Sequence, residues 1–299
     1  MKRLHQALWL LITALMLFQG KALFAEENKP LPWNLLPRLA ELGENQQAAF
    51  LDVLKSEQNY GKCKESVYDC LTMKNPDQTA VRITNFGAYL VSKGIPPRSL
   101  GRLVYDRATF AGLGTINTFN YKESPSMGDL EAKITITEFA EFKCLYCLAL
   151  SPVLKTLVEE SKGNVRFFFK HFPLKSHHGS ALASQAAQAA YRQGKFWDMY
   201  DRLFSDMNRQ GMEDLIRHAS ALGLDVERFK RDLEDPSLIG IIERDKMEGV
   251  SANVNGVPTL FINGKIYRFR HDEAFLKDMI NEEAERLGIT PPYQEWRYE

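Results

Sequence analysis

Residues 134–147 read ITITEFAEFKCLYC, and this stretch decides the fold. Apolar and polar residues alternate along its first half, and two cysteines separated by two residues follow. The pattern predicts a strand over 133–139, a helix over 145–158 and a second, wholly apolar strand over 165–169. The order strand, helix, strand predicts a βαβ unit with a parallel pair of strands.

Cys144 and Cys147 lie where the first strand gives way to the helix, so Cys144 is expected near the helix N-cap and Cys147 one turn inside. Unpaired backbone N–H groups and the positive end of the helix dipole favour a thiolate there, and Lys143 adds a cation. We therefore predict that Cys144 is the nucleophile and Cys147 the resolving thiol of a redox pair.

A structural disulfide or half of a zinc site is the alternative interpretation of the two cysteines. Zinc needs four ligands, and the chain has neither a second C-x-x-C nor an H-x3-5-H pattern. The adjacent His177 and His178 are interpreted as solvated loop residues. The sequence thus favours redox chemistry, with no metal and no cofactor.

Helical periodicity and clusters of Gly and Pro divide the rest of the chain. Helices are expected over 34–57, 76–92, 97–104, 181–190, 196–204, 212–222, 226–233 and 273–287, and a hairpin over 259–269 turns at Asn263-Gly264. The predicted segments are a signal peptide (1–25), a helical N-terminal module (26–111), a linker (112–130), a catalytic domain (131–290) and a tail (291–299).

Further motifs lie downstream: FFFKHFPL at 167–174, QGKFWDMYDRLF at 193–204 and GVPTLFINGK at 256–265. Together with the first stretch they resemble the thioredoxin-fold disulfide oxidoreductases of the DsbA-like group, over roughly 160 residues. The resemblance implies an α/β fold, a thioredoxin fold with a helical insertion at about 177–249. A small all-α N-terminal region precedes it.

The resemblance also implies roles for Pro258 and Glu138. Pro258 matches the cis-proline that faces the active-site disulfide, where an extended substrate adds as a strand; the alternative is an ordinary trans proline at the start of an edge strand. Glu138, six residues before Cys144, matches the buried acid beneath the disulfide and would accept the proton of Cys147. An exposed edge position is the alternative for Glu138.

Cys63 and Cys70 form a second pair in the N-terminal module. On one continuous helix their Cα atoms would lie about 10.5 Å apart, too far for a disulfide, so bonding requires a break between two helices. We favour a structural disulfide over a second redox centre, because no activating strand-to-helix turn precedes either residue. Oligomerisation, partner docking or simple packing are the expected uses of this module.

The charges also bear on compartment and partners. Lys+Arg and Asp+Glu both number 38, so nothing suggests binding to nucleic acid. Lys2, Arg3, the apolar run 7–18 and small residues up to Ala25 read as a signal peptide, with an uncleaved anchor as the alternative, and predict a periplasmic protein.

The sequence therefore predicts a periplasmic thiol:disulfide oxidoreductase. Its expected partners are unfolded or misoxidised secreted proteins and a membrane redox partner that recycles it. An oligomer built by the N-terminal module would favour isomerisation, and a monomer would favour oxidation. The alternatives are a thioredoxin-like protein that binds a soft metal such as copper and a redox-silent scaffold.

Overall fold

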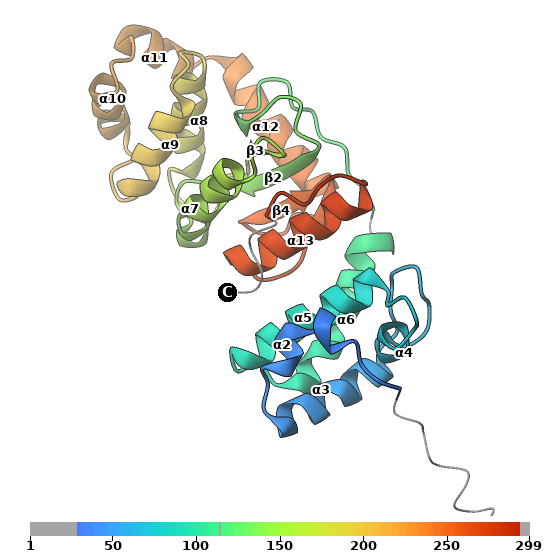
Figure 1. The fold of residues 1–299 in the computed structure, drawn as a ribbon. Coiled ribbons are helices and arrows are strands. Elements are labelled where there is room, and N and C mark those ends of the chain that lie inside the picture. Colours follow the sequence, from blue (N-terminus) through green and yellow to red (C-terminus); the bar gives the residue numbers. More distant parts are fainter. Residues whose placement is uncertain (1–28, 114, 294–299) are drawn as a thin grey trace, which may run out of the picture. The chain divides into compact units, whose positions relative to one another are not determined.

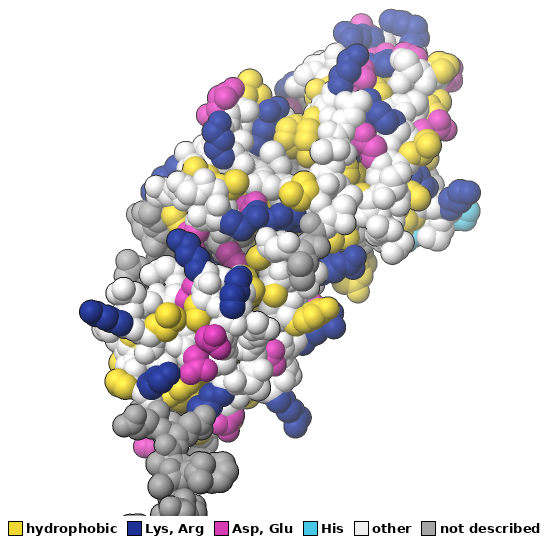
Figure 2. Space-filling model, turned by 90° about the vertical axis from the view of Figure 1, so that its right-hand side faces the viewer, with side chains coloured by type: hydrophobic (Ala, Val, Ile, Leu, Met, Phe, Trp, Pro, Cys, Tyr) yellow, Lys and Arg dark blue, Asp and Glu magenta, His cyan; other side chains and the backbone are white. Residues whose placement is uncertain are grey.

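The computed structural model describes residues 29–113 and 115–293, which form two compact units divided at residues 88 and 89 (Figure 1). The predicted signal peptide lies outside the described residues. In the described ranges, every helix is too short or too polar to span a bilayer. Basic and acidic side chains are interspersed over the face shown in Figure 2, in keeping with their equal numbers.

The first unit is built from short helices. They are η1 (Trp33–Leu35), α2 (Pro37–Ala40), α3 (Glu44–Ser56), α4 (Val67–Leu71) and the beginning of α5 (Gln78–Ser92). Helices α3 and α5 pack closely because Gly87 has no side chain: a Cβ there would lie 2.4 Å from the Phe50 ring. The expected all-α character of this region is confirmed.

A five-stranded sheet in the order β1-β3-β2-β4-β5 organises the second unit. The strands are β1 (Ser126–Gly128), β2 (Ile134–Ala140), β3 (Val165–His171), β4 (Thr259–Ile262) and β5 (Lys265–Tyr267). Strands β2 and β3 are parallel and the other pairs are antiparallel. The predicted βαβ pair and the α/β fold class are confirmed, and β2 lies at the centre of the sheet.

Helices cover both faces of this sheet (Figure 1). Helix α12 (Pro236–Ser251) packs on the face that carries Phe139, close enough that a Cβ on Gly249 would lie 2.9 Å from that ring. Helices α7 (Leu145–Glu160) and α13 (Glu273–Arg286) pack on the opposite face. Glu138 precedes Phe139 on β2 and therefore points to the α7 face.

The insertion between β3 and β4 is helical, as expected. It contains α8 (Ser180–Tyr191), α9 (Phe196–Ser205), α10 (Met212–Ala221), α11 (Val226–Leu233) and α12. The sequence analysis predicted four helices here and did not delimit α12. That helix begins with Pro236 at its first position, and the side chain of Asp235 accepts a hydrogen bond from the backbone N–H of Ser237, so capping signals were present.

Two parts of the predicted organisation differ from the structure. The predicted linker, 112–130, contains β1, which exists because Ser126–Gly128 pairs antiparallel with β3. Residues 89–111, which we placed in the N-terminal module, group with the second unit instead. They include η2 (Pro97–Ser99), α6 (Leu100–Ala108) and the first residues of η3 (Thr109–Leu113). The buried Arg107 of α6 explains this grouping, because it forms ion pairs with Asp278 and Glu282 of α13.

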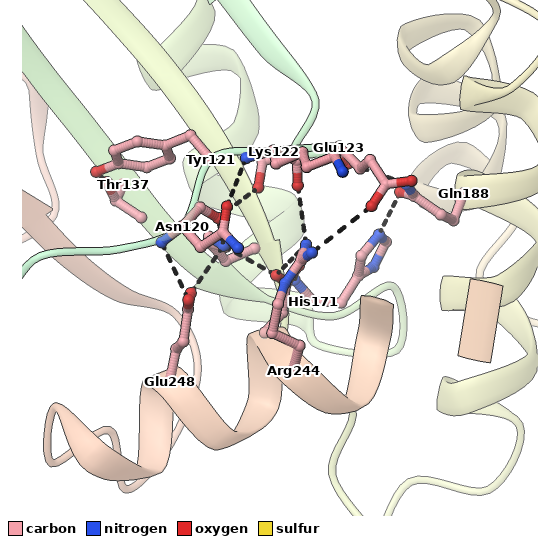
Figure 3. A network of polar contacts seen from close by, with 12 residues as sticks. Asn120, Tyr121, Lys122, Glu123, Thr137, His171, Gln188, Arg244 and Glu248 are labelled. Carbon is pink, nitrogen blue, oxygen red and sulfur yellow. Dashed lines mark hydrogen bonds and ion pairs between the residues drawn. The ribbon is translucent and has the colours of Figure 1, made fainter. Parts of the chain in front are cut away.

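A buried ionic network holds α12 against β3 (Figure 3). The Lys170 ammonium lies 2.9 Å from Asp245 and 2.8 Å from Glu248, and Lys170 and Asp245 are fully buried. Asp245 also accepts the backbone N–H of His171 at 3.1 Å. The network fixes the helix that leads into the loop before Pro258, and so it helps to position that loop.

Candidate active site

Cys144 occupies the N-cap of α7, as predicted. Its sulfur accepts the backbone N–H of Cys147 at 3.4 Å, and its carbonyl accepts the N–H of Leu148, so the first helical turn is capped by the thiol itself. Cys144 is 5% exposed and Cys147 is fully buried. Both are free thiols, with Cys147 one turn inside the helix.

The two thiols differ strongly in acidity. A hydrogen bond from the Cys147 thiol, followed by the backbone N–H groups of Cys147 and Tyr146, lowers the pKa of Cys144 to about 6, although burial opposes the shift. The pKa of Cys147 is raised by the hydrogen bond that its thiol donates to Cys144, by burial and by the charge of Glu138. At neutral pH the pair is therefore a thiolate at Cys144 and a thiol at Cys147.

Glu138 lies in the central strand β2 and is fully buried. Among the described residues, neither of its carboxyl oxygens has a hydrogen-bond partner. Burial first, and then the charge of Cys144, raises the pKa of Glu138 to about 8. An exposed edge position is therefore ruled out, and Glu138 is a carboxyl group that can change protonation state near neutral pH.

The Val257–Pro258 peptide bond is cis. The carbonyl oxygen of Val257 lies 3.5 Å from the Cys144 sulfur, so the main chain before Pro258 borders the thiol. Leu145 and Tyr146, which follow Cys144 in the chain, are 70% and 78% exposed. The nearly buried sulfur thus borders a main-chain carbonyl, and two exposed apolar residues come directly after it in the chain.

The sequence analysis missed a polar cluster beside this site. The fully buried Glu141 accepts hydrogen bonds from His177 Nδ1 and from the hydroxyl of Ser180, and the backbone N–H of Leu174 lies 3.5 Å away. His178 is exposed, in line with its interpretation as a solvated residue, whereas His177 is only partly exposed and bonds to the buried Glu141. An acid inside the apolar run FAEF, directly before the cysteines, was the signal that could have found it.

Cys63 and Cys70 form a disulfide in the first unit, with Cα atoms 5.8 Å apart. The break that the sequence required is present, because α3 ends at Ser56 and α4 begins at Val67. Asp77 holds the loop by accepting the backbone N–H of Cys63 at 2.9 Å. In the part of the chain that the structure describes, no group of three or more His, Cys, Asp or Glu side chains is arranged to hold a metal ion.

Comparisons with known proteins give a family model and a similar solved structure. A family model described as thioredoxin matches residues 120–282, more than half of the chain. A solved thioredoxin-like oxidoreductase from Silicibacter pomeroyi is 26% identical, with a TM-score of 0.48, and the match covers 55% of this chain and 93% of that one.

Curated relatives match only over part of their length. A Na(+)/H(+) antiporter NhaA 3 of Salinispora tropica is 37% identical over 139 residues, which are 46% of this chain and 21% of the antiporter. A Na(+)/H(+) antiporter NhaA of Herminiimonas arsenicoxydans is 33% identical over 161 residues, 54% of this chain and 25% of that protein. The chain thus spans about a quarter or less of these relatives.

Proposed function

The chain belongs to the thioredoxin family, and on that premise we propose that it is a thiol:disulfide oxidoreductase with Cys144 as the nucleophile and Cys147 as the resolving thiol. The observation that carries the proposal is the pair of free thiols at the start of α7, one capping the helix and the other buried a turn inside. A thiolate so stabilised is both a good nucleophile and a good leaving group.

The reduced enzyme reacts in two exchanges. The Cys144 thiolate attacks one sulfur of a substrate disulfide, which forms a mixed disulfide and releases the other substrate sulfur as a thiolate. Cys147 then loses its proton and attacks the Cys144 sulfur, which forms the Cys144–Cys147 disulfide and releases the second substrate thiolate. Oxidation of a substrate dithiol is the same sequence in reverse, with the same residues.

Glu138 is the proposed proton acceptor for Cys147. Its carboxyl group is close enough for its charge to raise the pKa of that thiol, and the buried surroundings give it a pKa near 8. In the mixed disulfide Cys144 carries no charge, so one of the causes that raise the pKa of Glu138 is gone; Glu138 then ionises more readily and its carboxylate can accept the thiol proton. Glu138 thus lets a buried thiol, which meets no bulk water, become a nucleophile.

The substrate is proposed to bind as an extended segment beside Pro258. The Val257 carbonyl at 3.5 Å from the Cys144 sulfur is an acceptor for a substrate backbone N–H, and the exposed Leu145 and Tyr146 offer apolar contact. Recognition of main chain and apolar surface suits unfolded or misoxidised secreted proteins. We further propose a periplasmic location, which the Cys63–Cys70 disulfide supports, and a membrane partner that recycles the pair.

Three assays on the signal-less protein test the function: oxidation of reduced ribonuclease, refolding of scrambled ribonuclease and reduction of insulin. Cys144→Ser is expected to abolish all three, and Cys147→Ser to accumulate a mixed disulfide. Light scattering on the same samples gives the mass. Refolding by an oligomer would assign an isomerase, and oxidation by a monomer an oxidase.

Absence of turnover in all three assays would contradict the proposal. Stoichiometric retention of Cu(I) by such an inactive protein would favour soft-metal binding by the two thiols.

A further inference from the structure

The Glu141 carboxylate is satisfied by one short stretch of chain. Leu174 and His177 belong to the loop between β3 and α8, Ser180 is the first residue of α8, and each presents a donor to one of the two oxygens. A carboxylate accepts at both oxygens, whereas a carboxylic acid would have to donate from one. The arrangement therefore fits an ionised, fully buried Glu141.

This carboxylate lies close in the chain to the reacting cysteines. Glu141 stands three residues before Cys144, at the start of the turn that leads from β2 into α7. A negative charge held this close disfavours a thiolate, and Glu141 accordingly acts to raise the pKa of Cys144. The charge of Glu141 thus works against the helix cap that activates the nucleophile.

His177 is placed to offset that charge. Its Nδ1 donates to Glu141, and the side chain is 38% exposed. A positive ring in contact with a buried carboxylate forms a neutral pair, whose field at a nearby sulfur is much weaker than that of the carboxylate alone.

The other charged groups around the loop have different partners. Lys143 donates to the carbonyl of Met207 at 2.9 Å, and Lys246 of α12 donates to the carbonyl of Pro173 at 2.6 Å. On β2, Glu138 points to the α7 face, and on β3, Lys170 is bonded to Asp245 and Glu248 of α12. Of the cations named here, His177 is the one bonded to Glu141.

We propose that Glu141 and His177 are a positioning pair that sets the reactivity of Cys144: His177 compensates the Glu141 carboxylate, so that a charge needed to tie two loops together does not suppress the thiolate. The pair deepens the proposed function and rests on it. Neither residue touches the substrate sulfur, and both act through Cys144.

The test measures the rate of iodoacetamide alkylation of reduced Cys144 against pH, in the full chain. His177→Asn keeps a donor at the place of Nδ1 and removes the positive charge, so the apparent pKa of Cys144 should rise by about half a unit, which slows alkylation at pH 5 about threefold. Glu141→Gln should shift the apparent pKa the other way. The double variant should match Glu141→Gln alone, because His177 acts through Glu141.

His178→Asn is the matched control, since it changes an exposed histidine next in the chain and should leave the profile of the wild type. Equal pH profiles of Cys144 alkylation for His177→Asn and His178→Asn would overturn the proposed role of the Glu141–His177 pair, whether or not Glu141→Gln folds. An ordinary thiol pKa for wild-type Cys144 would instead contradict the proposed function, and the comparison of the two histidine variants would still decide the role of His177.

Discussion

At Glu138 a single buried carboxyl group couples the chemistry to stability. Its pKa of about 8 in the folded protein exceeds the unfolded value near 4.5, so the folded state holds the proton more tightly. The stabilisation is complete below the unfolded pKa and is lost as pH rises from about 4.5 through about 8. The reduced protein should therefore lose stability between these pH values.

Glu138→Gln should remove this dependence. An uncharged amide does not ionise, so the variant should be more stable than the wild type at pH 7, by on the order of 3 kcal/mol, and similar to it at pH 4.5. Urea unfolding of both reduced proteins at the two pH values measures the difference. An equal difference in unfolding free energy at the two pH values would show that Glu138 does not titrate in this range. The variant should also resolve mixed disulfides more slowly than the wild type.

The sequence predicted some of these residues and not others, for a physical reason. Cys144 and Cys147 follow from local order, because the end of a strand and the start of a helix can be read from neighbouring residues, whereas the buried position of Glu138 was implied by the family resemblance. The partner of Glu141 is 36 residues away, in a loop without periodicity. A hydrogen bond of this kind depends on where the fold brings the loop, which local sequence does not encode.

Among the elements, the β4–β5 hairpin was predicted from its Asn-Gly turn, and both turn residues have positive φ, 48° and 76°. A Cβ on Gly264 would also lie 2.2 Å from the carbonyl oxygen of Asn117. Gly264→Ala should therefore lower the unfolding free energy by about 1 to 3 kcal/mol, as measured by urea unfolding.

Gly240→Ala is the matched control. Gly240 lies inside α12 with open space around it, so the substitution should raise the unfolding free energy by up to about 1 kcal/mol. Equal effects would contradict the account.

The network between α12 and β3 makes a second prediction at this scale (Figure 3). Lys170→Met should destabilise the second unit by about 3 to 5 kcal/mol, because it removes the nearer cation of the buried Asp245 and leaves only Arg244, at 3.4 Å. Glu248→Gln should cost less, since Glu248 is 22% exposed and can be solvated. Urea unfolding ranks the two variants, and a smaller cost for Lys170→Met than for Glu248→Gln would contradict this ranking.

The elements that the sequence did not delimit are those made by distant pairing. Strand β1 is only three residues long, SMG, and shows no alternation; it is a strand because β3 offers an edge to it. Helix α12 differs, since Asp235 and Pro236 are capping signals that mark its start in the sequence itself.

For the whole molecule, the division into two units predicts separable stabilities. Replacing both Cys63 and Cys70 by Ala opens a loop with a sequence separation of 7, which should destabilise the first unit by about 2 to 3 kcal/mol. Hydrogen exchange should then quicken within residues 29–88, while the amides around Cys144 keep their protection. Equal acceleration in both units would show that they unfold together.

The pH dependence of Cys144 alkylation in the reduced wild-type protein tests the central claim most directly. If Cys144 is the activated nucleophile, one thiol should react, with half-maximal rate near pH 6, and Cys147 should stay unmodified until the protein unfolds. Mass spectrometry of the modified peptide identifies the thiol. Half-maximal reaction near pH 8.5, or equal modification of Cys144 and Cys147, would contradict the account.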